Sequence, residues 1–172
     1  MIKKLCIFDF DGTIFKSPGP FKYYEYNIDD WYSDPLSLNP PMVPSAPDDS
    51  WFFTNIVNIA LEACQCKKTY TALVTGRRGD ISNFHSRIRG IVASKGIRFD
   101  EVHLKFEDIK TVEFKSEIIF QLAHRLEFEN KGLKEIHIYD DRHHHLPVFE
   151  KKLRLSKAKI YTHPVGTHNV SG

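Results

Sequence analysis

The sequence predicts an α/β protein of the Rossmann-like class, with a central parallel sheet flanked by helices. Two observations lead to this expectation. Short apolar segments alternate with segments whose apolar residues recur at helical spacing, and polar residues directly follow several of the apolar segments. Strands joined by helical crossovers run parallel, and the crossover helices cover both faces of their sheet. Because ligands bind such sheets at the carboxyl ends of the strands, the polar residues there are the candidates for a functional site.

Five segments have the composition of buried strands. The first, residues 5–8, is an uninterrupted run of Leu, Cys, Ile and Phe, which suits a strand that is buried on both faces. The other four expected strands are residues 70–74, 102–104, 136–139 and 159–162. Polar sequences follow three of the five, beginning at Asp9, Thr75 and Asp140.

Three segments between the strands have one apolar face at helical spacing. They are residues 53–64, 84–92 and 114–126, in which apolar side chains recur at intervals of three and four. The three consecutive histidines 143–145 suggest a zinc site at first sight. Neighbouring residues of a helix point about 100° apart, so we expect these histidines to begin a further helix instead.

Residues 17–50 are expected to form an irregular insertion or lid within a single domain that covers residues 1–172. The stretch from 17 to 53 holds seven of the nine prolines and nine aromatic residues. Proline at this density excludes a long helix or a central strand, whereas the aromatic content argues against a flexible linker. The insertion is too short for a full cap domain, so none is expected.

Composition places the chain among ordinary globular proteins. It has 172 residues, 41% hydrophobic and 27% charged, with a formal net charge of +2. Wholesale disorder is excluded, and the net charge gives no global field that favours nucleic acid or membrane binding. Asp9 and Asp11 interrupt the apolar stretch near the N-terminus, so neither a signal peptide nor a membrane span is expected. Three cysteines fit reduced thiols in the cytoplasm or nucleus.

The polar strand ends are expected to bring four carboxylates to one edge of the sheet, those of Asp9, Asp11, Asp140 and Asp141. Carboxylates this crowded repel one another unless a cation lies among them. Oxygen ligands without paired His or Cys residues suit Mg²⁺. Asp and Gly are also common turn residues, so a single such strand end could be a turn alone. The occurrence of polar sequences at three strand ends in order disfavours this alternative.

These residues carry a resemblance to a known family. The run Phe8-Asp9-Phe10-Asp11-Gly12-Thr13 resembles motif I of the haloacid dehalogenase (HAD) superfamily of phosphotransferases. Motifs II, III and IV are matched in order by Thr75, Lys115 and Asp140-Asp141. A closer resemblance, to the Swiss Army Knife RNA repair-like branch, depends on Phe15-Lys16-Ser17-Pro18, Trp31-Tyr32, Leu73-Val74-Thr75-Gly76-Arg77 and Ile138-Tyr139-Asp140-Asp141-Arg142 with His145. The Asp-Asp-Arg sequence is also similar to polynucleotide 3′-phosphatase domains.

The resemblance implies a Mg²⁺-dependent phosphatase of the HAD fold that removes a 3′-terminal phosphate from RNA or DNA. Asp9 would be the nucleophile that forms an aspartyl-phosphate, and Asp11 the general acid and base. Thr75 and Lys115 would contact the phosphoryl oxygens. Mg²⁺ would be held by Asp9, by the backbone carbonyl of Asp11 and by Asp140 and Asp141. A small-molecule or nucleotide phosphatase, and an inactive module that binds phosphorylated ends, remain alternatives.

Further substrate contacts are expected from residues beside these motifs. Gly76 and Arg77 follow motif II, and Arg142 follows motif IV. Trp31, in the insertion, has two interpretations: its ring stacks on a nucleic acid base, or it packs the insertion onto the main body. The sequence leaves both open.

Overall fold

A computed structural model gives the fold of the chain and describes residues 1–80 and 83–166. The centre is a five-stranded sheet in the order β3-β2-β1-β4-β5, with every neighbouring pair parallel. The strands are β1 (Lys4–Phe8), β2 (Thr69–Arg78), β3 (Glu101–Lys105), β4 (Glu135–Asp140) and β5 (Lys159–Pro164). The α/β prediction is confirmed.

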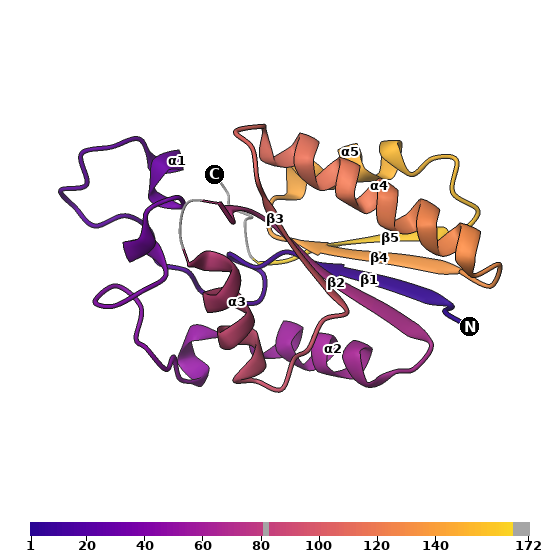
Figure 1. Cartoon of the computed structure of the whole chain (residues 1–172), viewed down its shortest axis with the longest axis horizontal. Helices are drawn as coiled ribbons and strands as arrows, with labels where there is room; N and C mark the ends of the chain where they lie inside the picture. Colours follow the sequence, from indigo (N-terminus) through magenta and orange to yellow (C-terminus); the bar gives the residue numbers. More distant parts are fainter. Residues whose placement is uncertain (81–82, 167–172) are drawn as a thin grey trace.

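Helices cover both faces of the sheet (Figure 1). On one face lie α2 (Thr54–Gln65) and α3 (Phe84–Ala93), and on the other lie α4 (Thr111–Glu129) and α5 (Leu146–Lys152). Strand β1 divides the two cores because its side chains alternate: Cys6 and Phe8 join one hydrophobic cluster, and Leu5 and Ile7 join the other. None of these four residues is more than 4% exposed, as the unbroken apolar sequence predicts.

The insertion lies beyond the carboxyl ends of the strands (Figure 1). It contains only short helical pieces, α1 (Ile28–Trp31), η1 (Pro35–Ser37) and η2 (Asp49–Trp51). Arg87 of α3 ties it to the main body, donating hydrogen bonds at 2.7–2.9 Å to three backbone carbonyls, those of Leu38, Pro44 and Ser45. The insertion therefore reaches the sheet edge where the polar strand ends meet.

Two boundaries differ from the prediction in a way that affects the site. Strand β2 does not end at residue 74 but continues to Arg78, because it pairs again with β3 after an irregularity, with Arg78 opposite Lys105. Helix α4 begins at Thr111, three residues before the expected start at 114. The three histidines form a single 3-10 turn, η3 (His143–His145), directly before α5.

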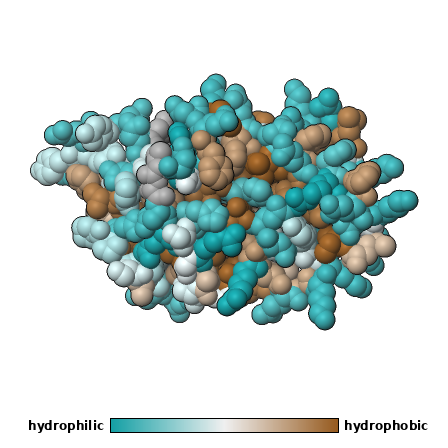
Figure 2. Space-filling model, in the orientation of Figure 1, coloured by the Kyte–Doolittle hydropathy of each residue, from teal (hydrophilic) through white to brown (hydrophobic). Residues whose placement is uncertain are grey.

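The face drawn in Figure 2 is mostly hydrophilic, with smaller hydrophobic patches between the polar side chains. No helix within the described residues has both the length and the hydropathy that crossing a membrane requires.

Candidate active site

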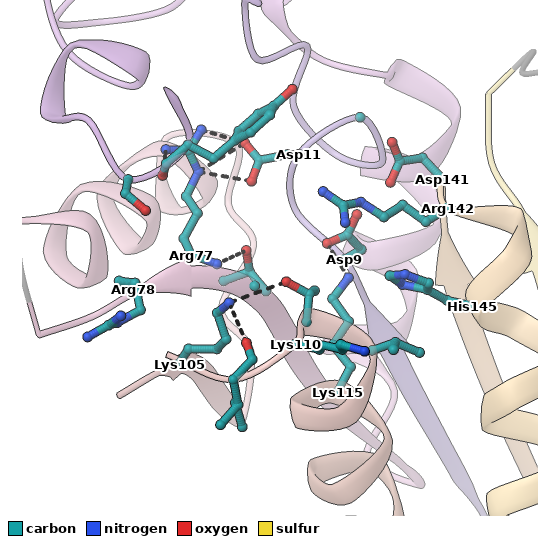
Figure 3. A pocket seen from close by; sticks show the side chains of 18 of the residues that line it. Asp9, Asp11, Arg77, Arg78, Lys105, Lys110, Lys115, Asp141, Arg142 and His145 are labelled. Atoms are coloured by element: carbon teal, nitrogen blue, oxygen red, sulfur yellow. Dashed lines mark hydrogen bonds and ion pairs between the residues drawn. The ribbon is translucent and has the colours of Figure 1, made fainter. Parts of the chain in front are cut away.

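The predicted catalytic residues line one cavity at the carboxyl ends of the strands (Figure 3). Its volume is about 620 Å³. Asp9 enters it from the end of β1, Thr75 from β2, Lys115 from α4 and Asp141 from the end of β4. The insertion adds Tyr32, so the main body and the insertion both form the walls.

Lys115 links two buried carboxylates at the floor of the cavity. Its ammonium donates to Asp9 Oδ1 and to Asp140 Oδ2, each at 2.8 Å. All three side chains are at most 7% exposed. Burial alone disfavours an ammonium, but the two carboxylates outweigh it and raise the pKa of Lys115. Lys115 therefore stays charged and fixes the position of Asp9.

Motif I approaches Asp141 closely, and Gly12 makes this approach possible. Gly12 has a φ of 74°, in the left-handed region, and a Cβ atom there would lie 2.3 Å from Asp141 Oδ2. Thr13, the next residue, donates its hydroxyl to Asp9 Oδ2 at 3.2 Å. The turn after β1 thus brings the Asp9 and Asp141 carboxylates together, and its Thr13 hydroxyl fixes the Asp9 carboxylate.

The carboxylates of Asp9, Asp140 and Asp141 lie within 4.8 Å of one another. The pKa of Asp9 is raised, mainly by burial and then by the neighbouring Asp140. The pKa of Asp141 is raised to about 7, mainly by burial and then by Asp9. A divalent cation in the cluster would offset this repulsion. The donors are all hard oxygens, so these residues fit Mg²⁺, with Asp140 shared with Lys115.

Asp11 faces away from this cluster, toward Arg77. The Arg77 guanidinium donates to both carboxylate oxygens of Asp11, with distances from 2.7 to 3.0 Å. Ser17 donates to Asp11 Oδ1 at 2.5 Å. Burial opposes ionisation of Asp11, but the Arg77 charge and its hydrogen bonds outweigh burial and hold the pKa of Asp11 below its usual value.

Arg77 itself is buried, and the insertion accepts hydrogen bonds from its Nη1. Its Nη1 donates to the backbone carbonyl of Tyr32 at 3.2 Å and to the hydroxyl of Ser37 at 2.7 Å. The guanidinium also lies over the rings of Tyr32 and Phe84. Although Arg77 lines the cavity, its guanidinium is used by Asp11 and the insertion. These contacts favour a positioning role for Arg77, and its direct contact with substrate stays a prediction.

Three other expected contacts, Thr75, Gly76 and Arg142, line the cavity. Thr75 is 1% exposed, and its hydroxyl accepts a hydrogen bond from the backbone N–H of Arg77 at 3.3 Å. Gly76 lies against the start of α4, where a Cβ atom would come within 2.5 Å of Thr111. Arg142 is exposed at the rim, and its backbone N–H donates to Asp140 at 2.9 Å.

The structure distinguishes between the two interpretations of Trp31. Its ring is 0% exposed, and its Nε1 donates to the carbonyl of Pro18 at 2.8 Å. Phe21 and Tyr24 meet the ring edge to face. A buried ring has no face available to a base, so the structure favours packing over stacking for Trp31.

We therefore expect Trp31→Ala to destabilise the protein by about 3 kcal/mol and to lower Tm by about 6–12 °C. Activity on aryl phosphates and on oligonucleotides should fall together, because the whole insertion loosens. Thermal denaturation with both assays measures this. Tyr23→Ala, at a position that is 77% exposed, is the matched control and should leave Tm unchanged. A selective loss on oligonucleotides at wild-type Tm would restore the stacking interpretation.

Three contributors to the site were not predicted from the sequence: Ser37, Lys105 and Lys110. Ser37 is one of several small polar residues in an aperiodic segment, so no pattern distinguishes it. Lys105 and Lys110 flank the segment that joins β3 to α4, and only the placement of that segment at the cavity reveals them. His145 follows motif IV and is 5% exposed, and its Nδ1 has no hydrogen-bond partner in the described part of the chain.

Comparisons with known proteins identify the family of the chain. Residues 22–170 match the family model described as HAD domain family 1 in Swiss Army Knife RNA repair proteins. The chain is also 29% identical to the uncharacterized protein YMR265C of Saccharomyces cerevisiae, over 87% of this chain and 36% of that protein. The chain thus spans about a third of the curated relative that it matches.

Solved structures share the fold. The HAD domain of the effector protein Lem4 from Legionella pneumophila, an inactive mutant, is similar with a TM-score of 0.60 and 13% identity, covering 99% of this chain and 89% of that one. A chain in the Pnkp1/Rnl/Hen1 complex is similar with a TM-score of 0.54 and 18% identity, covering 94% of this chain and 47% of that one. At such identities the likeness extends to the fold alone.

Proposed function

Since this chain belongs to HAD domain family 1 of the Swiss Army Knife RNA repair proteins, we propose that it is a Mg²⁺-dependent phosphomonoesterase. Its proposed substrate is the 3′-terminal phosphate of RNA or DNA, and its proposed role is the repair of nucleic acid ends. The family supports the phosphatase chemistry, and its RNA repair context supports the choice of substrate.

The observation that carries the proposal is the convergence of three groups from distant parts of the chain. Asp9 offers a carboxylate oxygen, and the Lys115 ammonium donates a hydrogen bond to it at 2.8 Å. Asp141 completes a cluster whose carboxylate oxygens lie within 4.8 Å of one another. A nucleophile, a fixed cation and a set of hard oxygen ligands are what transfer of a phosphoryl group requires.

In the first proposed step, an oxygen of Asp9 attacks phosphorus. A bond from Asp9 to phosphorus forms while the bond from phosphorus to the 3′ oxygen breaks. A proton from Asp11 goes to the leaving oxygen. Water then attacks the aspartyl-phosphate with Asp11 as base, which releases inorganic phosphate and restores Asp9. Lys115 and the Thr75 hydroxyl stabilise the charge on the phosphoryl oxygens.

Asp9, Asp141 and the backbone of Asp11 would hold Mg²⁺, with Asp140 behind them. When bound, the ion supplies positive charge that neutralises the crowded carboxylates and the substrate phosphate. Asp9 is thereby kept ionised, which a nucleophile requires.

Removal of the metal gives the first test of this function. Wild-type protein should release phosphate from p-nitrophenyl phosphate with Mg²⁺, lose this activity in excess EDTA and regain it when Mg²⁺ is restored. Mg²⁺ should also raise Tm, because it binds the folded state only, and Asp141→Asn should reduce this rise. Ca²⁺ should bind without supporting turnover, since its longer and looser coordination misplaces the nucleophile. Full activity in EDTA would contradict the metal-dependent mechanism.

The role of Asp11 can be tested separately. Because Arg77 favours the ionised carboxylate, acid catalysis requires that this ion pair loosen when substrate binds. We expect Asp11→Asn to reduce kcat about 10²- to 10⁴-fold on alkyl phosphates and less on aryl phosphates, whose leaving groups need no proton. A series of substrates with graded leaving-group pKa measures the difference. Equal losses across the series would contradict the role as acid.

A further inference from the structure

His145 is a buried side chain at the cavity that the proposed mechanism leaves without a role. It lies shortly after Asp141, in the turn η3, and is 5% exposed. In Figure 3 its ring extends from the wall that follows β4 toward Asp9 and Lys115. Because His145 lines the same cavity as these two residues, its ring faces the position that is expected for the phosphoryl group.

The Nδ1 atom of His145 has no hydrogen-bond partner. Among the buried side-chain nitrogen and oxygen atoms of residues 1–80 and 83–166, it alone is unpaired. The ring meets only the edges of two neighbouring rings, those of His144 and Phe149, at interplanar angles of 69° and 70°. An unpaired buried polar atom costs free energy of folding, so packing alone does not explain a histidine at this position.

The imidazole of His145 is neutral at physiological pH. Burial, and then the charge of Lys115, lower the pKa of His145 to about 4. A neutral imidazole carries one N–H group and one lone pair. A buried N–H without an acceptor is rarer than an unpaired lone pair, so we assign the proton to Nε2. Nε2 lies at the end of the ring away from the backbone, and its N–H is a donor that adds no charge beside Lys115.

We propose that His145 is a substrate-binding residue whose Nε2–H donates a hydrogen bond to an oxygen of the phosphoryl group. This inference rests on the proposed phosphatase function. A phosphoryl group carries negative charge on three oxygens, and Thr75 of β2 and Lys115 of α4 are expected to contact it. His145 adds a neutral donor from the segment after β4. The ring thus costs stability in the free protein and contributes affinity for phosphate.

Substitution of His145 by leucine tests both parts of this proposal. Leucine fills a similar volume without the unpaired nitrogen, so Tm should stay at the wild-type value or rise. Affinity for inorganic phosphate in the presence of Mg²⁺ should fall about tenfold or more, because a hydrogen bond to a charged group is lost. Calorimetric titration measures the affinity, and thermal denaturation measures Tm. His145→Gln should retain most of the affinity, because its side-chain amide can place an N–H near the position of Nε2.

His144→Leu is the matched control, since His144 is exposed in the same turn and is not among the residues that line the cavity. It should leave phosphate affinity and Tm unchanged. Wild-type phosphate affinity in His145→Leu protein would overturn the proposal. A fall in Tm together with affinity would also overturn it, because the ring would then act through packing.

NMR of the histidine ring nitrogens provides a second measurement that needs no variant beyond the one that assigns the signal, His145→Gln. In wild-type protein with Mg²⁺, added phosphate should shift the Nε2–H signal of His145, and an unshifted signal at saturating phosphate would overturn the proposal. Binding of phosphate requires no turnover. Wild-type protein that binds phosphate but hydrolyses no phosphomonoester would therefore refute the phosphatase and leave the role of His145 in binding intact.

Discussion

Asp9→Asn is expected to reduce phosphate release by about 10³-fold or more. An amide lacks the anionic oxygen that attacks phosphorus, so the loss should appear in kcat for every substrate, whatever the leaving group. The amide is nearly isosteric. Its one carbonyl oxygen can still accept from Lys115, and its NH2 group can donate to the Thr13 hydroxyl, so the fold should persist. Steady-state kinetics with p-nitrophenyl phosphate measure the loss, and circular dichroism checks the fold.

Asp48→Asn provides the matched control for this substitution. Asp48 lies outside the cavity and caps η2, accepting a hydrogen bond from the backbone N–H of Ser50 at 2.9 Å. Asn caps helices as well as Asp does, so activity and Tm should both stay at wild-type values. If Asp9→Asn protein kept more than about a tenth of wild-type kcat, a loss of only about 1.4 kcal/mol in barrier, Asp9 would not be the nucleophile.

Lys115→Met is expected to lower both stability and activity. Removing the ammonium leaves Asp9 and Asp140 buried within 4.8 Å of each other without their cation. The loss of one partner from a buried ion pair costs about 3–5 kcal/mol of unfolding free energy. Activity should fall as well, because no ammonium then positions Asp9 or stabilises the phosphoryl oxygens.

The pH dependence of this loss separates charge from packing. Burial and Asp140 already raise the pKa of Asp9, and removal of Lys115 raises it further. A carboxyl whose pKa is raised by folding destabilises the protein progressively as pH rises above the pKa of the unfolded state, and the full penalty is reached above the raised pKa. The defect of Lys115→Met should therefore shrink as pH falls. Denaturant unfolding at a series of pH values measures it. Adding Asp140→Asn should restore part of the stability at neutral pH without restoring activity. A defect that is independent of pH would indicate a packing cavity instead.

The strands and the carboxylates at their ends could be predicted from the sequence because local rules determine them. Four apolar residues in a row require burial on both faces, and an Asp directly after such a strand must lie at its carboxyl end. Lys115 is different, since it lies 106 residues from its partner Asp9. On a helix flank such a lysine looks like any exposed lysine, and only the order of the family's motifs distinguished it.

The side-chain orientations of the insertion could not be predicted from the sequence. Its prolines remove the periodicity that assigns side chains to faces, so composition indicated an ordered segment without showing which groups point inward. Stacking and packing both remained open for Trp31 until its burial was known. Arg77 followed motif II, which suggested a substrate contact, but Ser37 and Tyr32 approach it from the insertion and direct it to Asp11. Long-range contacts of this kind depend on tertiary structure.

The central proposal is a metal-dependent phosphatase for 3′-terminal phosphates, and a substrate panel tests it most directly. Oligonucleotides of one sequence would carry a 3′-phosphate, a 5′-phosphate or a 2′,3′-cyclic phosphate, and phosphate release would be measured with Mg²⁺ and with EDTA. The account predicts release from the 3′-phosphate only, in Mg²⁺ only, and no release by Asp9→Asn protein. Absence of release from every member of the panel, or release that persists in EDTA, would contradict it.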